Sequence, residues 1–284
     1  MKYDKISGFL DEISENVDTQ FRVMKKLGIG YFEPRGINGK SIAELSGKEL
    51  TDLKEKMGSY EIKASSIGSP IGKVRLAEDF EEHFGQFQQV VETARVLDTK
   101  YIRVFSFYHE NGAEWSAEER AEILARLGRM ISYASEHDVI LLHENEKDIY
   151  GDTVERCVDL MESLGCEHFR AVFDPANFVQ CGQDTMEAYR RLRAHIAYVH
   201  IKDALFADGS VVPVGMGDGN VRQVLSSLLE SGYTGFFSLE PHLGDFVGLK
   251  DLEVNGGTTK RPQSGEDTFT IAYRALEDIL DGIL

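Results

Sequence analysis

The stretch Val139-Ile-Leu-Leu-His-Glu144 is a mainly apolar run that ends in a carboxylate and is followed by a loop-like segment. Three later stretches end in the same way: Phe169-Arg-Ala-Val-Phe-Asp174, Ile196-Ala-Tyr-Val-His200 and Thr234-Gly-Phe-Phe-Ser-Leu-Glu240. Each run has the length and composition of a short buried strand, and a helix-length segment separates it from the next. If these strands are parallel neighbours, their last side chains emerge at one edge of one sheet.

Four earlier strand-like runs continue the pattern toward the N-terminus. We expect these strands near Ile6–Phe9, Tyr31–Glu33, Glu61–Ser65 and Tyr101–Phe105. Helices are expected near Thr19–Leu27, Gly47–Met57, Ala77–Leu97, Ala117–His137, Thr153–Leu164, Thr185–Ala194, Arg222–Ser231 and Asp267–Leu280. In the segment 117–137 the apolar residues recur with the i, i+3, i+4, i+7 spacing of a helix with one buried face. The strict alternation predicts an α/β fold, a single-domain (β/α)8 TIM barrel over residues 1–284, with an open doubly wound sheet as the alternative.

The composition is that of a folded protein with a strongly acidic surface. Hydrophobic side chains make up 42% of the 284 residues, enough for a full core, and the formal charge is −17. That charge argues against nucleic-acid binding, which needs a concentrated basic face, but leaves small phosphorylated ligands open. The three cysteines show no CxxC pairing, and we find neither a signal peptide nor an apolar stretch of about 20 residues. We therefore predict a cytoplasmic protein without a membrane partner, and a homo-oligomer is compatible with the sequence.

The strand-end residues Glu144, Asp174, His200 and Glu240 combine three carboxylates with one imidazole. Facing a common point, these groups would repel one another strongly unless a cation held them. An oxygen-rich set with one nitrogen favours Mn²⁺, and Mg²⁺, Co²⁺, Fe²⁺ or Zn²⁺ are alternatives. Four protein ligands leave two positions of an octahedral shell for substrate oxygens, so one divalent ion could chelate a hydroxyketone and polarise its carbonyl. A carboxylate on either side of the substrate carbon could then remove a proton from one face and return it to the other.

Each strand-end residue also has an ordinary structural interpretation. Glu144 could form a salt bridge with a nearby arginine or lysine, and Glu146 is a rival ligand two residues further along. Asp174 precedes a proline, and aspartates at such positions commonly form Asx-turns. A histidine such as His200 at the end of a buried strand is often a hydrogen-bonded core residue, and Asp203 or a backbone carbonyl could fix its tautomer. The four positions together, at the ends of successive strands, favour the metal site.

Other polar residues near the same edge are candidates for substrate contact. They are Glu33, Arg103, His109, Asn177, Lys202 and His242. An ion pair between Glu33 and Arg103 inside the barrel is the alternative for those two residues, and a solvated side chain is the alternative for Lys202. The run Val214-Gly-Met-Gly-Asp-Gly219 lacks the setting of a nucleotide-binding loop, and we expect a rim loop or lid there. A mobile segment is expected at Asn255-Gly-Gly257.

Several motifs carry a resemblance to a known family. The motifs His143-Glu-Asn145, Phe173-Asp-Pro-Ala-Asn177, Val199-His-Ile-Lys-Asp203 and Ser238-Leu-Glu-Pro-His242 resemble the sugar phosphate isomerase/epimerase family, the xylose isomerase-like TIM barrels. This family includes ketose 3-epimerases, hydroxypyruvate isomerase and inosose dehydratase, and the resemblance covers nearly the whole chain. It implies a single divalent metal ion at Glu144, Asp174, His200 and Glu240, with Glu144 and Glu240 doubling as the acid/base pair.

The resemblance implies an isomerase or epimerase that acts on a sugar, a sugar phosphate or a related hydroxyketone through an enediolate. Tyr150, Asn177 and Phe206 depart from the epimerase pattern, in which a glutamate, a histidine and an arginine stand at these positions. A lyase similar to inosose dehydratase, acting on a polyol ketone, is therefore the main alternative. An endonuclease-IV-like hydrolase would need several zinc ions and a basic groove, which 8 histidines and a charge of −17 do not favour. A sugar-binding protein without catalysis is a further alternative.

Overall fold

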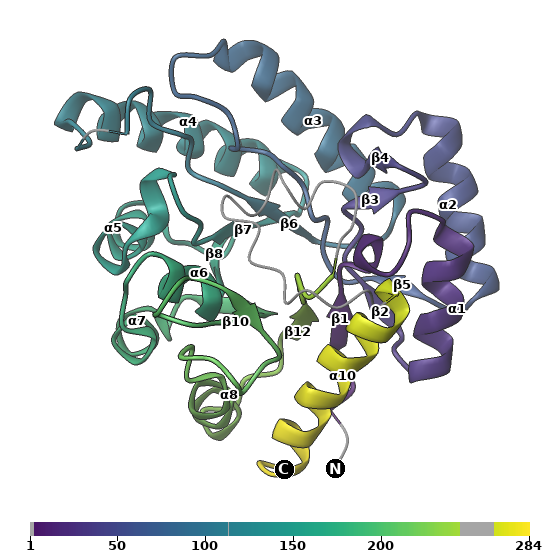
Figure 1. Ribbon diagram of the computed structural model, residues 1–284. Coiled ribbons are helices and arrows are strands. Elements are labelled where there is room, and N and C mark those ends of the chain that lie inside the picture. The colour runs from purple at the N-terminus through teal and green to yellow at the C-terminus, as the bar shows by residue number, and fades with distance from the viewer. Residues whose placement is uncertain (1–2, 113, 245–263) are drawn as a thin grey trace.

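The computed structural model describes residues 3–112, 114–244 and 264–284, and it shows strands at the centre with helices around them (Figure 1). Six parallel strands form one sheet in the order β1-β12-β9-β8-β7-β6. These strands are β1 (Ile6–Gly8), β12 (Phe236–Leu239), β9 (Ile196–Ile201), β8 (Phe169–Phe173), β7 (Ile140–Glu144) and β6 (Tyr101–Val104). Two short parallel strands, β2 (Tyr31–Phe32) and β5 (Lys63–Ala64), pair with each other.

Backbone hydrogen bonds on both sides of the β2–β5 pair close the ring. Glu33 N donates to Gly8 O at 2.9 Å, which joins the end of β2 to β1. On the other side, Ile67 N donates to Tyr101 O at 2.9 Å and Arg103 N donates to Ile67 O at 3.0 Å, which joins the segment after β5 to β6. The predicted TIM barrel is therefore confirmed, and an open sheet, which would keep two unpaired edges, is excluded.

The helices lie outside the ring of strands, as right-handed crossovers between parallel strands require (Figure 1). They are α1 (Val17–Leu27), α2 (Gly47–Ser59), α3 (Phe80–Val96), α4 (Ala117–Glu136), α5 (Val154–Leu164), α7 (Thr185–Leu192), α8 (Val221–Glu230) and α10 (Gly265–Asp281). Ser46 and Ser116 form capping boxes at the starts of α2 and α4, and Thr153 accepts a hydrogen bond from Arg156 N at the start of α5. Every helix that the sequence predicts is present.

The sequence does not predict the short elements in the loops. These are the hairpins β3–β4 (Gly36–Ile37 and Lys40–Ser41) and β10–β11 (Asp203–Ala204 and Val211–Val212), the helix α6 (Pro175–Gln180) and the 3-10 helices η1 (Leu10–Glu12), η2 (Ile42–Glu44) and η3 (Tyr150–Asp152). Segments this short cannot display a hydrophobic period. They follow barrel strands along the chain, so they shape the edge of the barrel at which the carboxyl ends of the strands lie.

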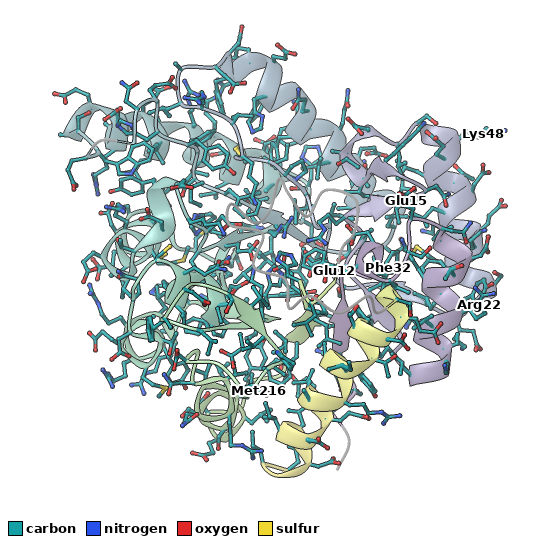
Figure 2. The ribbon with its side chains drawn as sticks, viewed as in Figure 1. Glu12, Glu15, Arg22, Phe32, Lys48 and Met216 are labelled. Carbon is teal, nitrogen blue, oxygen red and sulfur yellow. The ribbon has the colours of Figure 1, made fainter. Side chains whose placement is uncertain are left out.

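Apolar side chains fill the space between the strands and the helices. Phe32 on β2 is fully buried, whereas Arg22 on α1 and Lys48 on α2 are exposed on the outside of the ring (Figure 2). Charged residues are buried as well, and Glu12 on η1 is only 5% exposed. A buried carboxylate is costly unless it is paired and hydrogen-bonded, so the charged residues inside the barrel must form a connected set.

Some expectations concern parts of the chain away from the barrel centre. The segment Asn255-Gly-Gly257 lies outside the described residues. Within the residues that the structure describes, no helix has the length and apolar character needed to cross a membrane. Cys157, Cys166 and Cys181 are free thiols.

Candidate metal centre

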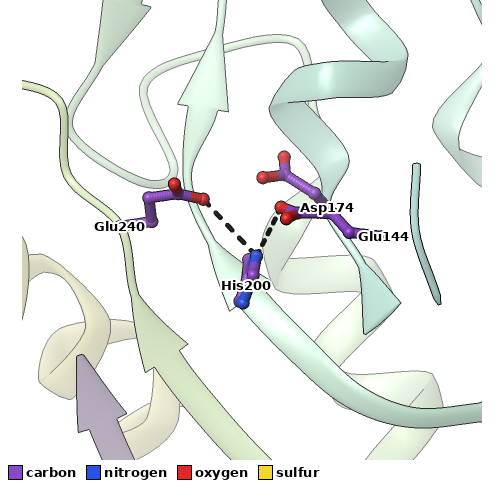
Figure 3. A group of neighbouring side chains, drawn as sticks. All are labelled: Glu144, Asp174, His200 and Glu240. Atoms are coloured by element: carbon purple, nitrogen blue, oxygen red, sulfur yellow. Dashed lines mark hydrogen bonds and ion pairs between the residues drawn. The ribbon is translucent and has the colours of Figure 1, made fainter. Parts of the chain in front are cut away.

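Glu144, Asp174, His200 and Glu240 converge at the carboxyl edge of the barrel (Figure 3). One possible ligand atom from each side chain lies within 4.8 Å of those from the other three. The four residues are buried, with relative exposures of 1%, 0%, 0% and 3%. Among the described residues, they are the one group of His, Cys, Asp and Glu side chains with this geometry. The strand-end residues named from the sequence therefore meet at one point.

The convergence follows from the register of the strands. Glu144 on β7 pairs with Val172 on β8, and Asp174 stands two residues beyond Val172. In the same way, His200 on β9 pairs with Ser238 on β12, and Glu240 stands two residues beyond Ser238. Residues two apart on a strand face the same side of the sheet, and the stagger between neighbours is the shear of a closed barrel. All four ligand candidates thus face the barrel interior near its rim.

The imidazole of His200 lies between two groups of carboxylates. Its Nδ1 is 2.5 Å from Glu144 Oε1 and 3.4 Å from Glu240 Oε2, whereas its Nε2 is 3.3 Å from Glu33 Oε2. Ser238 Oγ donates a hydrogen bond of 2.7 Å to the same oxygen of Glu33. Burial opposes protonation of His200, but Glu144 and Glu33 raise its pKa well above the ordinary value. Nδ1 therefore faces Glu144 and Glu240, and Glu33 contacts the opposite side of the ring.

The sequence suggested that Asp203 or a backbone carbonyl could fix the tautomer of His200. In the structure, Asp203 binds elsewhere. Its carboxylate accepts hydrogen bonds from the backbone nitrogens of Gly215, Gly217 and Gly219 at 2.9, 3.0 and 2.9 Å. A Cβ atom added at Gly217 would overlap Asp203 Oδ1, so this close approach requires glycine. The glycine-containing run is confirmed as a rim loop before α8, and it binds a carboxylate of the protein itself. A lid function for this loop stays a prediction.

Two asparagines position Asp174 at the start of α6. Asp174 Oδ1 accepts from Asn177 N at 2.9 Å, so the aspartate caps the helix rather than an isolated turn. Asn145 donates from Nδ2 to Asp174 O at 2.9 Å and accepts from Asp174 N at 3.0 Å. Asn177 Nδ2 in turn donates to Asn145 O at 2.9 Å. The side-chain amide of Asn177 thus supports the site, and its predicted contact with substrate remains untested.

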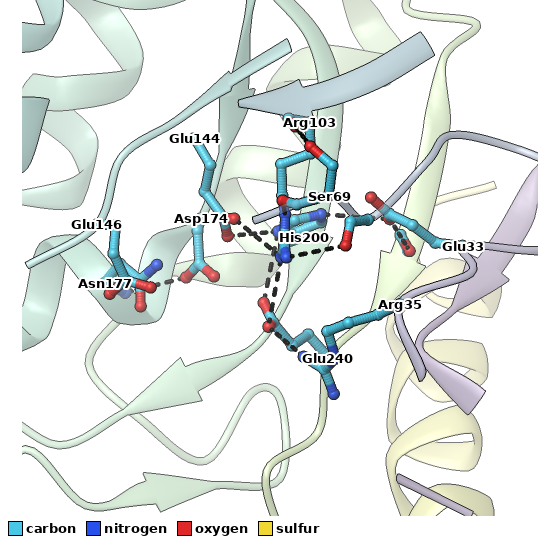
Figure 4. Close-up of polar contacts among 12 residues, drawn as sticks. Glu33, Arg35, Ser69, Arg103, Glu144, Glu146, Asp174, Asn177, His200 and Glu240 are labelled. Atoms are coloured by element: carbon cyan, nitrogen blue, oxygen red, sulfur yellow. Dashed lines mark hydrogen bonds and ion pairs between the residues drawn. The ribbon is translucent and has the colours of Figure 1, made fainter. Parts of the chain in front are cut away.

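Two cations bring positive charge to the ligand group: Arg103, which Figure 4 shows beside Glu144, and Lys202. Arg103 Nη1 is 3.2 Å from Glu144 Oε2 and 3.9 Å from Glu240 Oε1. Lys202 Nζ is 3.1 Å from Asp174 Oδ2 and 3.4 Å from Glu240 Oε2. The alternative of a solvated Lys202 is wrong, because its side chain is only 2% exposed. Arg103 forms its ion pairs with the ligand group. The alternative was an ion pair between Arg103 and Glu33, but Glu33 instead contacts His200.

A second charged layer surrounds Glu240. Arg35 Nη1 is 3.1 Å from Glu240 Oε1, and its other nitrogens pair with Asp11 at 2.8 Å and with Glu12 at 3.3 Å. His242 Nε2 is 3.3 Å from Glu240 Oε1, and the backbone nitrogen of His242 donates to Glu12 Oε2 at 2.7 Å. Sequence reasoning missed Glu12 and Asp11, since both belong to a short 3-10 helix that carries no motif.

Two further residues of the rim have partners outside the ligand group. Glu146, the rival ligand, forms an ion pair of 3.0 Å with Lys73, which also lies over the ring of Phe105. His109 Nε2 is 3.2 Å from Glu119 Oε1, and its ring packs edge-on against Trp115. His109 lines a surface pocket of about 710 Å³ on the loops after β6 and β7. Its predicted contact with substrate stays a prediction.

The pKa values of Asp174 and Glu240 are shifted in opposite directions. Burial raises the pKa of Asp174 to about 7, although Lys202 opposes the shift. Burial also opposes ionisation of Glu240, but Lys202, His242 and His200 together hold its pKa well below the usual range. Of these two carboxyls, Asp174 therefore binds a proton more readily than Glu240. A bound cation would stabilise both as carboxylates.

The donor set fits a divalent ion. Asp174 Oδ2 is buried and receives no hydrogen bond from the described residues, although Lys202 Nζ lies 3.1 Å away. A buried carboxylate oxygen without a hydrogen bond is costly, and a metal ion is a partner that would satisfy it. Three carboxylates and one imidazole nitrogen are the hard and borderline ligands that Mn²⁺, Mg²⁺ and related ions accept.

The fold and the site together define a class: TIM barrels that carry a metal-type ligand set at the carboxyl ends of their strands, where such barrels place their active sites. Within that class, the chain belongs to the xylose isomerase-like TIM barrel family, whose model matches residues 21–255. The resemblance inferred from the four strand-end motifs is confirmed by this match.

Similar proteins include a dehydratase and an epimerase. Over 165 residues the chain is 25% identical to the 3-dehydroshikimate dehydratase of Bacillus anthracis, in an alignment that covers 58% of this chain and 57% of the relative. The solved structure of the IolI protein with a bound zinc atom matches with a TM-score of 0.78 at 19% identity, covering 99% of both chains. That of the D-allulose 3-epimerase from a Methylomonas species matches with a TM-score of 0.75 at 14% identity, covering 98% of this chain and 99% of the other. At these identities the structural matches establish the shared fold.

Proposed function

We propose that the chain is a divalent-metal-dependent isomerase or epimerase that acts on a sugar, a sugar phosphate or a related hydroxyketone through an enediolate. The observation that carries the proposal is the buried group of Glu144, Asp174, His200 and Glu240, whose ligand atoms lie within 4.8 Å of one another. An epimerase and a zinc-containing structure among the similar folds support it. Mn²⁺ is the ion that we favour, because oxygen-rich sets with one nitrogen suit it.

The bound ion would polarise the carbonyl of the substrate and so acidify the neighbouring C–H bond. Glu144 ends β7 and Glu240 follows β12, and β8 and β9 lie between these two strands in the sheet. Carboxylates from separate strands can reach the substrate carbon from different sides. One of them removes the proton; its return to the neighbouring carbon gives isomerisation, and its return to the opposite face gives epimerisation.

The cations beside the two glutamates suit the charge that develops in this reaction. Loss of the proton places negative charge on the former carbonyl oxygen, and preorganised cations in a dry site stabilise such charge. Arg103 contacts Glu144 and Lys202 contacts Glu240, so both cations lie beside the proposed acid/base pair. Both are also buried, which excludes the water that would otherwise screen them.

Dehydration is the second candidate, and specific observations favour it. The relative with 25% identity is a 3-dehydroshikimate dehydratase. The departures from the epimerase pattern bring no acid or base to the ligand group: the Tyr150 hydroxyl donates to Asp159, and the Phe206 side chain is 50% exposed. A lyase would form the same enediolate next to a leaving hydroxyl, and Lys202, 3.1 Å from Asp174 Oδ2, would supply the proton that this hydroxyl needs.

Metal binding and product analysis in deuterated water test the proposal. We expect the purified protein to bind one divalent ion per chain in a calorimetric titration with Mn²⁺. Ketoses, ketose phosphates and polyol ketones are then incubated with the loaded protein and followed by mass spectrometry. Isomerisation or epimerisation can introduce deuterium into the product without loss of water. Dehydration instead removes about 18 daltons, because water leaves the enediolate. A protein that takes up no divalent ion would refute both candidates.

A further inference from the structure

We propose that the amino end of the barrel binds a small carboxylate that carries an aromatic ring, at a site separate from the candidate metal centre. A pocket of about 540 Å³ opens there, and small-molecule sites typically measure about 300–1,000 Å³. Its lining comes from β2, β5, β6 and β12, from the last turns of α2 and from the segment after α3. No metal ion takes part, so the site is independent of the proposed function.

Strand alternation turns the aromatic lining of the pocket toward the barrel interior. Phe32 on β2 packs against α1, so Tyr31 before it faces the opposite way, into the barrel. Tyr31 packs edge-on against Phe236, with ring centres 4.9 Å apart. Tyr101 packs in the same way against Tyr198, at 6.3 Å. The rings of Tyr31, Tyr101 and Phe236 therefore form an apolar wall of the pocket.

Two lysines bring positive charge to this wall. Lys63 pairs with Tyr31 in the register of β2 and β5, so its side chain extends on the same side of the strands. It is exposed, and among the described residues its ammonium group has neither an ion pair nor a hydrogen bond. Lys5 Nζ lies 5.6 Å from the centre of the Phe236 ring and donates to the backbone oxygen of Thr234 at 2.7 Å. The chain as a whole has a formal charge of −17, so this end of the barrel departs from its average.

The acidic residues in the lining have lysine partners of their own. Glu61 pairs with Lys25 at 3.1 Å, and Asp98 pairs with Lys54 at 2.5 Å. Lys100, also in the lining, pairs at 2.5 Å with an aspartate outside the pocket. Lys63 is thus the one lining cation without a carboxylate partner among the described residues. A carboxylate of a ligand would supply that partner.

A layer of buried side chains closes the barrel between this pocket and the metal centre. Leu142, Val172 and Tyr198 pack together there, with exposures of 0%, 3% and 0%. Each stands two residues before one of the metal ligand candidates on or just after β7, β8 and β9. Ser65 lies at the floor of the pocket, and its Oγ is 2.8 Å from the Tyr198 hydroxyl. A small ligand in the pocket therefore does not reach the metal ligands.

A flat ring with a carboxylate matches both parts of the pocket. The ring can pack against the aromatic wall in the edge-on or offset arrangements that aromatic pairs prefer. The carboxylate can accept a hydrogen bond from Lys63. An uncharged ring would leave Lys63 without a partner, and a carboxylate without a ring would leave the apolar wall in water.

Ligand-observed NMR titrations test the site with three probes: benzoate, benzyl alcohol and acetate. We expect benzoate to bind at least about fivefold more tightly than either of the others, because it alone uses the lysine and the rings together. The titrations are made after chelation of metal ions and again with Mn²⁺ added. The benzoate affinity should agree within about twofold, as expected for separate sites. Benzoate that binds only with Mn²⁺ would lie on the metal centre and overturn the proposal, whereas failure of Mn²⁺ to bind overturns the proposed function alone.

Variants assign the binding to the pocket. Lys63→Gln should weaken benzoate about two- to fivefold and leave benzyl alcohol unchanged, as expected for loss of an exposed ion pair. Lys48→Gln is the matched control, because Lys48 is an exposed lysine on α2 outside the ring of strands (Figure 2). Tyr101→Leu should weaken both ring-bearing probes at least about twofold, with thermal unfolding as the check on its fold. Benzoate that binds no more tightly than benzyl alcohol, or equally well to Lys63→Gln, overturns the proposal.

Discussion

Replacing Glu33 by glutamine removes a charge that contacts the proposed metal centre through His200. Glu33 Oε2 lies 3.3 Å from His200 Nε2 and also accepts the Ser238 hydroxyl at 2.7 Å. Burial opposes ionisation of Glu33, yet His200 keeps its pKa below the ordinary value, so the substitution removes a full negative charge. A carboxylate on the far nitrogen of a metal-bound histidine orients the ring and raises its basicity.

Loss of such a partner typically weakens metal binding 10- to 100-fold, or about 1.4–2.7 kcal/mol. Because Glu33 is buried, water cannot take its place, and we expect a value toward the upper end. The assay is a calorimetric Mn²⁺ titration of Glu33→Gln beside Glu61→Gln, which alters an exposed glutamate paired with Lys25. Thermal unfolding of both metal-free variants checks that the fold is kept. An Mn²⁺ affinity within twofold of the parent protein would refute the role assigned to Glu33.

Three further predictions concern the loop, the acid stability and the reaction. Gly217→Ala should destabilise the protein by about 1–3 kcal/mol in urea unfolding, since its Cβ would overlap Asp203, whereas Gly85→Ala, with open space inside α3, should stabilise it by about 0.5–1 kcal/mol. Burial lowers the pKa of His143 from 6.5 to about 3, so below pH 6.5 the unfolded chain binds a proton that the folded chain does not. Stability from this residue is complete above pH 6.5 and falls by up to about 1.4 kcal/mol per pH unit toward pH 3, and His143→Gln should flatten that slope. Glu240→Gln should keep the fold but abolish turnover, and undiminished deuterium incorporation would remove its proposed role as a base.

The fold and the four ligand candidates could be predicted because their signal is local. Each barrel strand is a short apolar run, and the polar residue at its end stands beside the run in the sequence, as Glu144 does in Val139–Glu144. Parallel strands in a barrel place these ends at one rim, so sequence position alone brings the residues together. The register then supplies the stagger that makes His200 and Glu240 meet.

The polar network around the ligands could not be predicted, because its partners are far apart in the chain. Glu12 binds the backbone of His242 across 230 positions, and Arg35 reaches Glu240 across 205 positions. The sequence offers Asp203, or a backbone carbonyl, as a partner of the nearby His200, but in the structure Asp203 accepts hydrogen bonds from the loop around Gly217. Tertiary packing determines such contacts, and the periodicity of the sequence does not predict them.

The same long-range contacts govern when the site can form during synthesis. Arg35 and Glu12 leave the ribosome 205 and 230 residues before their partners Glu240 and His242. Until then, Arg35 can pair with Asp11 and Glu12 but not with Glu240, and the ligand group lacks its fourth member. The earliest moment at which a nascent chain could capture a metal ion thus coincides with closure of the barrel. Metal uptake would then indicate that β12 has joined β1 and β9 in the barrel.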